Sequence, residues 1–467
     1  MDLADDVQRT RWREHLGGLL RDRSLVCGIA PLAGFTELVS VLEQAGARRP
    51  LVVASAVGAG PTPAPEQAEV VLLDVEPRPT MTEDLRRQDA IAHALPVDVR
   101  RAVDAFDPDR EASWLVGPYI GTAPIDGRAV VGGRPDSWVA LEDKLVADQI
   151  WDAVGGVRAP SVVVPLEPQA LRDASRALDE GHGVVWAGDA RDGFNGGGEF
   201  VRWVATDLDA ASALVFFAPR CDRVRVMPFL DGVPCSIHGM VLPDGTAAFR
   251  PVELAILRGP ERRFVYGGLG TTWDPPGADR AQMRDLARRA GEHLRSTAGY
   301  RGAFGIDGIL TADGFRPTEL NARMSGGIAS IARTVDPALF TLLQYNLLDG
   351  RDPGVDVGDL EAWALPQMDA GRFARPIAMS ARQVAADPFD VHVVWDGTSL
   401  TRSWAATGWS VSVGPSSAGT YCRLVTPPCV TGTRVADLNV ALMRFLDAEL
   451  GTSFGEVAAA PDLRANR

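Results

Sequence analysis

The sequence predicts an α/β protein of several domains, and three observations predict this fold class. Apolar strands alternate with helical stretches over residues 24–140. Two short strands around residues 183–204 enclose a glycine-rich loop, and a polar β-hairpin follows at residues 303–323. A chain of 467 residues is long enough for about three domains. We place the boundaries of the units at 1–137, 138–225, 226–340 and 341–467.

The first unit has the pattern of a small Rossmann-type domain. Three apolar runs indicate buried parallel strands, and a helical periodicity separates the first two. The strands are expected at Leu25–Ala30, Leu51–Ser55 and Val70–Asp74, and the helix at Thr36–Ala45. Gly58 and Gly60 follow a strand, but Pro61 comes next where the dinucleotide-binding fingerprint needs a helix opening with glycine. A nicotinamide-binding function is therefore excluded.

The middle of the chain is expected to form a helix and then a strand–loop–strand unit. We expect a helix over Trp138–Ala153 and a second one over Gln169–Leu178. Short strands are expected at Pro160–Pro165, Gly183–Ala187 and Phe200–Val204, and the last two flank the glycine-rich segment at residues 188–198. The β-rich stretch from Arg223 onwards includes 224–230 and 236–242.

The later elements carry clearer boundary signals. Asp279 is the expected N-cap of an amphipathic helix that ends at Gly299. A hairpin follows, with strands at 303–312 and 315–323 joined by the turn residues Asp313 and Gly314. Residues 391–425 are expected to form a short antiparallel sheet, and residues 435–450 a closing helix.

Composition excludes several functional classes. Apolar residues make up 46% of the chain, but no apolar run approaches the roughly 20 residues that span a bilayer. The net charge is −14, and no basic run with interleaved aromatics favours nucleic acid as a partner. The polar, acidic N-terminus does not resemble a secretory signal. The cysteines are odd in number and scattered, which favours reduced thiols in the cytoplasm: Cys27, Cys221, Cys235, Cys422 and Cys429.

Lys144 is the single lysine in a chain with 47 basic residues, all the others being arginine. An ammonium is a compact point charge, whereas a guanidinium is a rigid planar fork, so the two are not interchangeable at a binding site. The count alone leaves a functional role for Lys144 and chance retention equally open.

The hairpin carries the most informative chemical pattern. Alternate residues of a strand share a face, so Glu319, Asn321 and Arg323 are expected to point the same way, with Asp307 opposite them on the partner strand. Two carboxylates and an amide oxygen are hard ligands that suit Mg²⁺, and an arginine beside them can neutralise a phosphoryl group. The alternative is a polar, solvent-facing strand, but Asp307 and the possible anion-binding turn at 325–327 favour the metal site.

Two further segments fit a nucleotide site. The five glycines of residues 188–198 let backbone N–H groups approach phosphates, and the loop between two strands can close as a lid. Its alternative is a flexible surface turn. The apolar stretch of residues 225–232 can clamp a purine, although alone it also fits a plain core strand. His238 lies in a strand and is expected to be structural.

The order of these elements over residues 138–335 resembles the ATP-grasp superfamily, preceded by a pre-ATP-grasp-like domain. Finer features resemble the peptide ligases of pheganomycin-type biosynthesis, at Leu141–Lys144, Val185–Gly197 and Gly314–Arg323. The resemblance implies an α/β ATP-grasp fold: a Rossmann-like pre-ATP-grasp domain, a two-lobed ATP-grasp core and a small C-terminal α+β region. It further implies a cytoplasmic enzyme that uses ATP and two Mg²⁺ ions to join a carboxylate to an amine, as in antibiotic biosynthesis.

The resemblance also implies roles for individual residues. Asp307, Glu319 and Asn321 would hold the metal ions, and Arg323 would be catalytic, with Arg258 as a further candidate. The nucleotide would contact Lys144, Trp186, Gly193, Gly196, Gly197, Met227, Phe229 and Leu230. Members of the superfamily carry a second phosphate-binding lysine where this chain has Trp186. Either Arg191 or Arg202 replaces that charge, or phosphate binding is weaker at this corner of the site.

The substrates implied are an amino-acid carboxylate donor and an amine or peptide acceptor, with neither nucleic acid nor membrane as a partner. Ligation of a small non-peptide amine or a thiol, and a nucleotide-binding protein that has lost catalysis, remain as alternatives. The C-terminal residues 341–467 either complete the acceptor site or form a homodimer contact, and their sequence does not distinguish the two.

Overall fold

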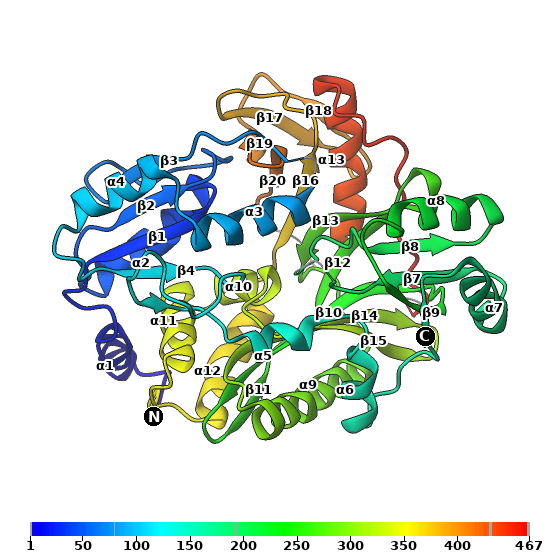
Figure 1. The fold of residues 1–467 in the computed structure, drawn as a ribbon, viewed down its shortest axis with the longest axis horizontal. Helices are drawn as coiled ribbons and strands as arrows, with labels where there is room; N and C mark the ends of the chain where they lie inside the picture. Colours follow the sequence, from blue (N-terminus) through cyan, green and yellow to red (C-terminus); the bar gives the residue numbers. More distant parts are fainter. Residues whose placement is uncertain (1, 79, 192, 194, 429–431, 465–467) are drawn as a thin grey trace.

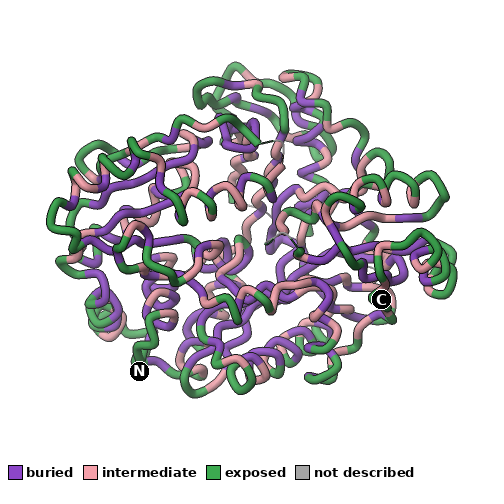
Figure 2. Tube along the Cα trace, viewed as in Figure 1, coloured by how far each residue is buried: buried purple, intermediate pink, exposed green. Residues whose placement is uncertain are grey.

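The computed structural model describes residues 2–78, 80–191, 193, 195–428 and 432–464. Within these residues the strands form three sheets, shown in Figure 1: one in the N-terminal domain, one in a small lid and one central sheet. Figure 2 shows buried residues along the strands and exposed residues along the outer loops and helix surfaces. No helix in this part of the chain is both long and apolar enough to cross a membrane.

The N-terminal domain holds a parallel sheet with the strand order β3-β2-β1-β4-β5. Its strands are β1 (Leu25–Ala30), β2 (Leu51–Ala54), β3 (Glu69–Leu72), β4 (Ser113–Val116) and β5 (Val130–Val131). Its helices are α1 (Asp6–Gly17), α2 (Thr36–Gln44), α3 (Met81–His93) and α4 (Val97–Phe106). The parallel pairing of the three expected strands is confirmed. The prediction that β3 is buried is wrong, because β3 lies at the sheet edge, where Leu72 is half exposed.

The lid is a four-stranded antiparallel sheet with the order β6-β9-β7-β8, covered by two helices. Its elements are β6 (Val162–Pro165), α7 (Pro168–Leu178), β7 (Val184–Gly188), β8 (Val201–Val204), α8 (Asp207–Phe217) and β9 (Arg223–Pro228). β7 and β8 pair antiparallel, which confirms that the glycine-rich segment joins two strands of a hairpin.

The central sheet runs in the order β15-β14-β10-β12-β13-β16-β20-β19-β17-β18, with β11 paired to β10. Its first strands are β10 (Val233–Leu242), β11 (Gly245–Ala248), β12 (Val252–Arg258), β13 (Phe264–Gly270), β14 (Gly302–Thr311) and β15 (Gly314–Asn321). The C-terminal strands are β16 (Ala374–Ser380), β17 (Phe389–Trp395), β18 (Leu400–Arg402), β19 (Trp409–Ser416) and β20 (Gly419–Val425). The antiparallel strands expected over residues 391–425 therefore continue the central sheet through the pairing of β13 with β16.

Helices cover both ends of the central sheet. α9 (Gly277–Ala298) packs beneath β10, β11 and β14, and α13 (Val435–Leu450) packs on β12, β13 and β16. Helices α10 (Gly326–Ala332), α11 (Pro337–Leu348) and α12 (Val357–Ala370) share one hydrophobic core with the N-terminal domain. That shared core fixes the N-terminal domain against the central sheet.

Two expected helix features are corrected by the structure. The helix of residues 138–153 is broken into α5 (Asp136–Val139), a 3₁₀ turn at Ala140–Glu142 and α6 (Ala147–Ala153). Asp143 is extended, and its carboxylate accepts a hydrogen bond from the Leu145 N–H at 2.9 Å, which is an Asx turn that competes with the helix. Asp279 is not an N-cap, because α9 begins two residues earlier, after Pro276, and Asp279 instead pairs with Arg464.

The described cysteines Cys27, Cys221, Cys235 and Cys422 are all buried, while Cys429 lies outside the described residues.

Candidate active site

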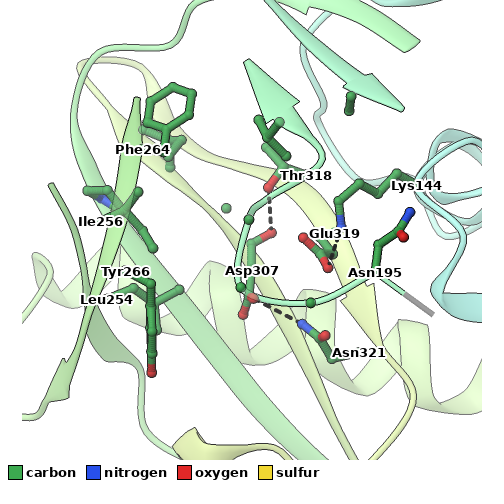
Figure 3. Close-up of a pocket in the computed structure, with 18 of the residues that line it drawn as sticks. Lys144, Asn195, Leu254, Ile256, Phe264, Tyr266, Asp307, Thr318, Glu319 and Asn321 are labelled. Carbon is green, nitrogen blue, oxygen red and sulfur yellow. Dashed lines mark hydrogen bonds and ion pairs between the residues drawn. The ribbon is translucent and has the colours of Figure 1, made fainter. Parts of the chain in front are cut away.

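A cavity of about 350 Å³ lies between the lid, the N-terminal domain and one face of the central sheet. The lid contributes β7, the glycine loop and the segment after β9, while the central sheet contributes β12, β13 and the β14–β15 hairpin. Figure 3 shows Asp307, Glu319 and Asn321 beside Lys144 and Asn195 in this cavity. The hairpin and the lid, about a hundred residues apart in the sequence, therefore face each other across one space.

The hairpin places the three expected metal ligands together. Asp307 on β14 stands directly opposite Glu319 on β15, and the Asn321 amide donates to the Asp307 carboxylate at 2.9 Å. All three line the cavity. Burial and the neighbouring Glu319 charge raise the pKa of Asp307 to about 6. Two carboxylates this close repel each other, and a cation bound between them would relieve that repulsion.

The composition of this ligand set limits which ion fits. No group of three or more His, Cys, Asp or Glu side chains able to hold a metal occurs among the described residues. Two carboxylates and one amide do not complete an octahedral shell. Mg²⁺ is commonly held by one or two carboxylates and completes its shell with water and phosphate oxygens. The residues present therefore fit Mg²⁺ bound together with a nucleotide.

Lys144 reaches the same cluster from the break between α5 and α6. Its ammonium is largely buried and lies 2.8 Å from the Glu319 carboxylate. The Asx turn at Asp143 positions this lysine, because a continuous helix would place it differently. The lone lysine of the chain is thus beside the candidate metal ligands.

Arg323 is held by a shared carboxylate on the other side of the cluster. Glu142 accepts hydrogen bonds from both Arg323 and Arg134, and the Tyr119 ring centroid lies 5.2 Å from the Arg323 guanidinium carbon. Burial opposes the charge of Arg323, but the adjacent Glu142 outweighs it and raises the pKa of Arg323 above its usual value. Arg323 therefore stays cationic in a buried position.

The glycine loop is closed over the cavity and docked on the N-terminal domain. Gly196 and Gly197 line the cavity. The Gly196 N–H donates to the Thr82 hydroxyl at 3.1 Å, and the Met81 N–H at the start of α3 donates to the Glu199 carboxylate at 2.8 Å. The loop is therefore a lid whose closed position is held by another domain.

The segment after β9 forms the wall expected for a purine. Met227, Phe229 and Leu230 all line the cavity. Phe229 is stacked on Trp203, with ring centroids 4.1 Å apart, and its N–H donates to the Gly183 carbonyl at 3.0 Å. An apolar strip backed by a fixed aromatic pair is suited to the face of a nucleobase.

Trp186 does not reach the cavity, which corrects its expected place at the nucleotide. Alternate residues of β7 face the cavity, namely Val185 and Ala187, so Trp186 points into the lid core and donates to the Ser175 hydroxyl at 3.0 Å. The cavity-facing position at the end of this strand is Ala187. Directly opposite Ala187 on β9 is Arg225, which also lines the cavity.

Four other expected residues lie away from the cavity. Arg202 stacks over the Phe216 ring at 3.7 Å, and Arg191 pairs with Asp222, so neither replaces a phosphate-binding lysine. Gly193 is in the loop but does not line the cavity. Arg258 does not line the cavity. It pairs with Asp231, and its guanidinium carbon lies 5.1 Å from the Phe229 ring centroid, so it does not act beside Arg323.

The sequence interpretation missed several cavity residues. Tyr119 comes from the N-terminal domain and Arg225 from a strand that otherwise has an apolar pattern. The apolar wall formed by β12 and β13 was also missed: Leu254, Ile256, Phe264, Tyr266 and Leu269. The sequence of β12 carries no signal for this wall, because apolar residues occupy both faces of the strand.

Comparison with solved structures identifies the fold. The chain is similar to the L-amino acid ligase of Bacillus licheniformis, with a TM-score of 0.52 and 14% identity, over 94% of this chain and 100% of that one. It is also similar to the biotin carboxylase domain of Hydrogenobacter thermophilus 2-oxoglutarate carboxylase in complex with MgADP, ADP and bicarbonate, with a TM-score of 0.55 and 14% identity over 95% and 92%.

A third similar structure is carboxyaminoimidazole ribonucleotide synthase of Aspergillus clavatus in complex with ATP, with a TM-score of 0.51 and 11% identity, over 94% of this chain and 100% of that one. No family model and no curated protein sequence matches the chain. The similarity extends over nearly the whole length of each chain at very low identity, so it establishes architecture. The chain has the ATP-grasp fold.

Proposed function

We propose that this protein is an ATP-dependent, ADP-forming carboxylate–amine ligase that joins an amino-acid carboxylate to the amino group of an amino acid or peptide through an acyl phosphate. One observation carries the proposal. Lys144, the carboxylates of Asp307 and Glu319, and Arg323 meet in a single cavity under a closed glycine lid, although they come from separate parts of the chain. The resemblance to pheganomycin-type ligases favours a peptide acceptor and a role in natural-product biosynthesis.

Each group has a task in this reaction. Mg²⁺ held by Asp307, Glu319 and Asn321 would reduce the charge that opposes attack on the terminal phosphate of ATP. Lys144 binds phosphate oxygens, and the strip from Met227 to Leu230 holds adenine. Arg323 binds the oxygens of the donor carboxylate and of the acyl phosphate, and later the oxyanion formed when the amine attacks. The closed loop excludes water, which would hydrolyse the acyl phosphate.

The reaction can be tested with Mg-ATP, a mixture of amino acids and short peptides, chromatography of the nucleotides and mass spectrometry of the products. The expected products are ADP, phosphate and an amide whose mass equals the two substrates less one water. Formation of AMP would contradict an acyl phosphate. Formation of ADP and phosphate with a thioester product would instead establish ligation to a thiol.

A further inference from the structure

One face of the central sheet continues beyond the cavity wall. Partly exposed residues alternate with buried ones along β12, β16 and β20, three strands of one sheet, and the buried side of these strands packs on α13. Leu254 and Leu269 of this face line the cavity. The register places Arg375 of β16 directly opposite Leu269, and Arg423 of β20 directly opposite Ile377. Arg375 therefore lies one strand beyond the cavity wall at β13, and Arg423 lies two strands beyond it.

Arg375 and Arg423 have no acidic partner among the described residues. In the part of the chain that the structure describes, no carboxylate lies within 4.0 Å of Arg375 or Arg423. Arg375 donates only to the Ser330 hydroxyl, at 3.0 Å, and the buried Nε of Arg423 has no hydrogen-bond partner there. The nearest acid in this register is Asp390, on the same face two strands from Arg423, where it accepts a hydrogen bond from Ser412.

Burial of such charge is unfavourable unless a counter-ion arrives. Burial, together with the charges of Arg333 and Arg423, lowers the pKa of Arg375. Arg333 is the third cation of this region and is already paired with Glu37. A desolvated guanidinium without a carboxylate costs several kcal/mol in general terms, so a site of this kind is expected to bind an anion.

The charge of Arg375 acts on a residue of the cavity wall. Burial raises the pKa of the Tyr266 hydroxyl, and the charges of Asp307 and Arg375 act on it in opposite directions. Tyr266 lines the cavity, so one cavity residue lies within electrostatic range of both Asp307 and Arg375. Loop 58–60 of the N-terminal domain closes the far side, because a Cβ on Gly60 would lie 3.4 Å from the Arg423 guanidinium.

We propose that Arg375 and Arg423 bind the free carboxylate of the amine acceptor, so that the acceptor class is a short peptide or amino acid with an unmodified C-terminus. This inference rests on the proposed ligase function and adds the acceptor's chemistry. In the proposed reaction Arg323 binds the donor carboxylate, which is converted to the acyl phosphate. A second anion site on the side away from the lid would therefore suit a carboxylate that does not react. Neighbouring strands are about 4.8 Å apart, so Arg375 and Arg423 are one and two strand spacings beyond the β13 wall, which favours a peptide over a single amino acid.

The test compares L-alanyl-L-alanine with its C-terminal amide as probes, titrated by calorimetry into protein saturated with Mg-ADP. The wild-type protein is expected to bind the free acid at least about 10-fold more tightly, which is the usual gain from a hydrogen bond to a charged group. Arg375→Gln, Arg423→Gln and the double variant should lose this preference. Arg402→Gln, on the exposed β18 of the same sheet, is the matched control and should keep it.

Equal binding of acid and amide to the wild type, including no binding of either, overturns the inference, as does a preference that survives in the double variant. Circular dichroism and thermal unfolding show whether each variant is folded, and the two single variants keep the test valid if the double variant is not. The ligase function is tested separately. If ADP and an amide product form equally well from the amidated acceptor, the proposed function is supported and the proposed carboxylate subsite is refuted.

Discussion

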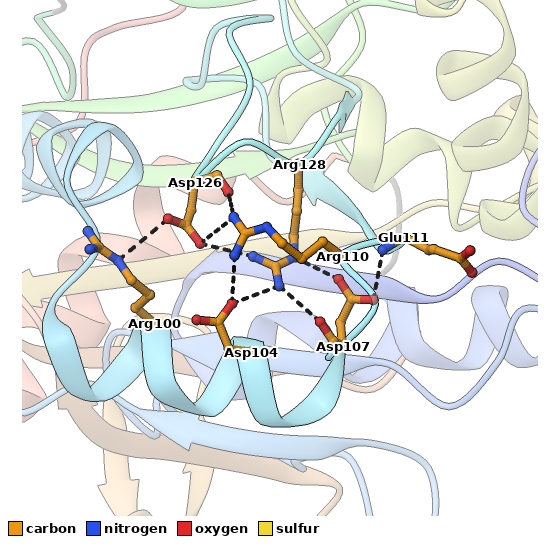
Figure 4. A network of polar contacts seen from close by, with 7 residues as sticks. All are labelled: Arg100, Asp104, Asp107, Arg110, Glu111, Asp126 and Arg128. Atoms are coloured by element: carbon orange, nitrogen blue, oxygen red, sulfur yellow. Dashed lines mark hydrogen bonds and ion pairs between the residues drawn. The ribbon is translucent and has the colours of Figure 1, made fainter.

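The fully buried Arg128 and the half-buried Arg375 and Arg423 are held in the protein in opposite electrostatic settings. Arg128 in the N-terminal domain is fully buried and is surrounded by Asp104, Asp107 and Asp126 at 2.7–2.9 Å, as Figure 4 shows. Arg375 and Arg423 on the central sheet have no such carboxylates among the residues described. The difference separates an arginine whose charge is satisfied by the fold from arginines whose charge is available to a ligand.

Arg323 is intermediate between these two cases. It is buried and paired, but its carboxylate partner Glu142 also binds Arg134. One negative charge shared between two guanidiniums fixes the position of Arg323 without neutralising the pair. A residue that must meet several anionic species in turn needs this combination of fixed geometry and remaining charge.

Substitution of Arg128 is expected to have the largest effect on stability. Arg128→Met should lower the free energy of unfolding by roughly 3–5 kcal/mol, because Asp107 would remain as a buried carboxylate without its cation, while Asp104 and Asp126 keep Arg110. Urea denaturation followed by circular dichroism measures this loss. Arg423→Gln should change stability by less than about 1 kcal/mol, since it leaves no acid unpaired. Equal losses in the two variants would show that the absence of acidic partners does not distinguish the sites.

The second test concerns the candidate metal ligands Asp307 and Glu319 and measures the rate of ADP formation. Glu319→Ala should reduce ADP formation by roughly 10²–10³-fold, because Asp307 and Asn321 alone hold the ion weakly and Lys144 loses its partner. The assay is initial-rate ADP release with the substrates found in the ligation screen. Asp313→Ala, at the exposed turn of the same hairpin, is the control and should retain activity. Undiminished turnover in Glu319→Ala would refute the assignment of this cluster.

Substitution of Glu142, which Arg323 and Arg134 share, is expected to have a smaller effect on turnover. Glu142→Gln should lower kcat by about 10–100-fold through misplacement of Arg323, with little change in the KM for ATP. Glu142→Asp keeps the charge and should restore part of the activity. A rise in the KM for ATP with an unchanged kcat would mean that Arg323 acts on nucleotide binding instead.

His238 shows a third way to bury a basic group, as the neutral form. Burial lowers the pKa of His238 to about 3, whereas an unfolded histidine titrates near 6.5. Between these values the unfolded chain binds the extra proton, so this residue makes stability fall as pH falls from about 6.5 towards 3, by up to about 1.4 kcal/mol per pH unit. His238→Asn should reduce that slope in urea titrations at several pH values. The exposed His182→Asn should leave it unchanged.

The parts of the site that the sequence predicted are those encoded by local patterns. Asp307, Glu319 and Asn321 share a face because strand residues alternate and one turn fixes the hairpin register. The same alternation explains the error at Trp186, where a shift of one residue exchanges the cavity face for the core. The glycine-rich segment and the apolar strip at residues 227–230 were likewise predicted to border one site, because each pattern lies in consecutive residues, and both line the cavity.

The parts that the sequence did not predict depend on distant contacts. Tyr119 lines the cavity and Arg375 lies one strand beyond its β13 wall, and neither has a distinctive sequence neighbourhood. The break at Asp143 was missed because one side-chain hydrogen bond outweighs an otherwise helical pattern. Absence of an acidic partner is itself a tertiary property, so the distinction between Arg128 and Arg423 could not be drawn from the sequence.

The continuity of the central sheet has a practical consequence for dissecting the protein. β16 supplies the hydrogen-bond partner of β13, and the N–H of Val435 and the guanidinium of Arg434 hold the fully buried Glu253. A protein shortened before β16 would therefore expose the edge of β13, uncover the apolar Leu257 and leave a carboxylate buried without its cation. Such a fragment would aggregate rather than report on the isolated nucleotide site, so the C-terminal strands must be studied by substitution and not by deletion.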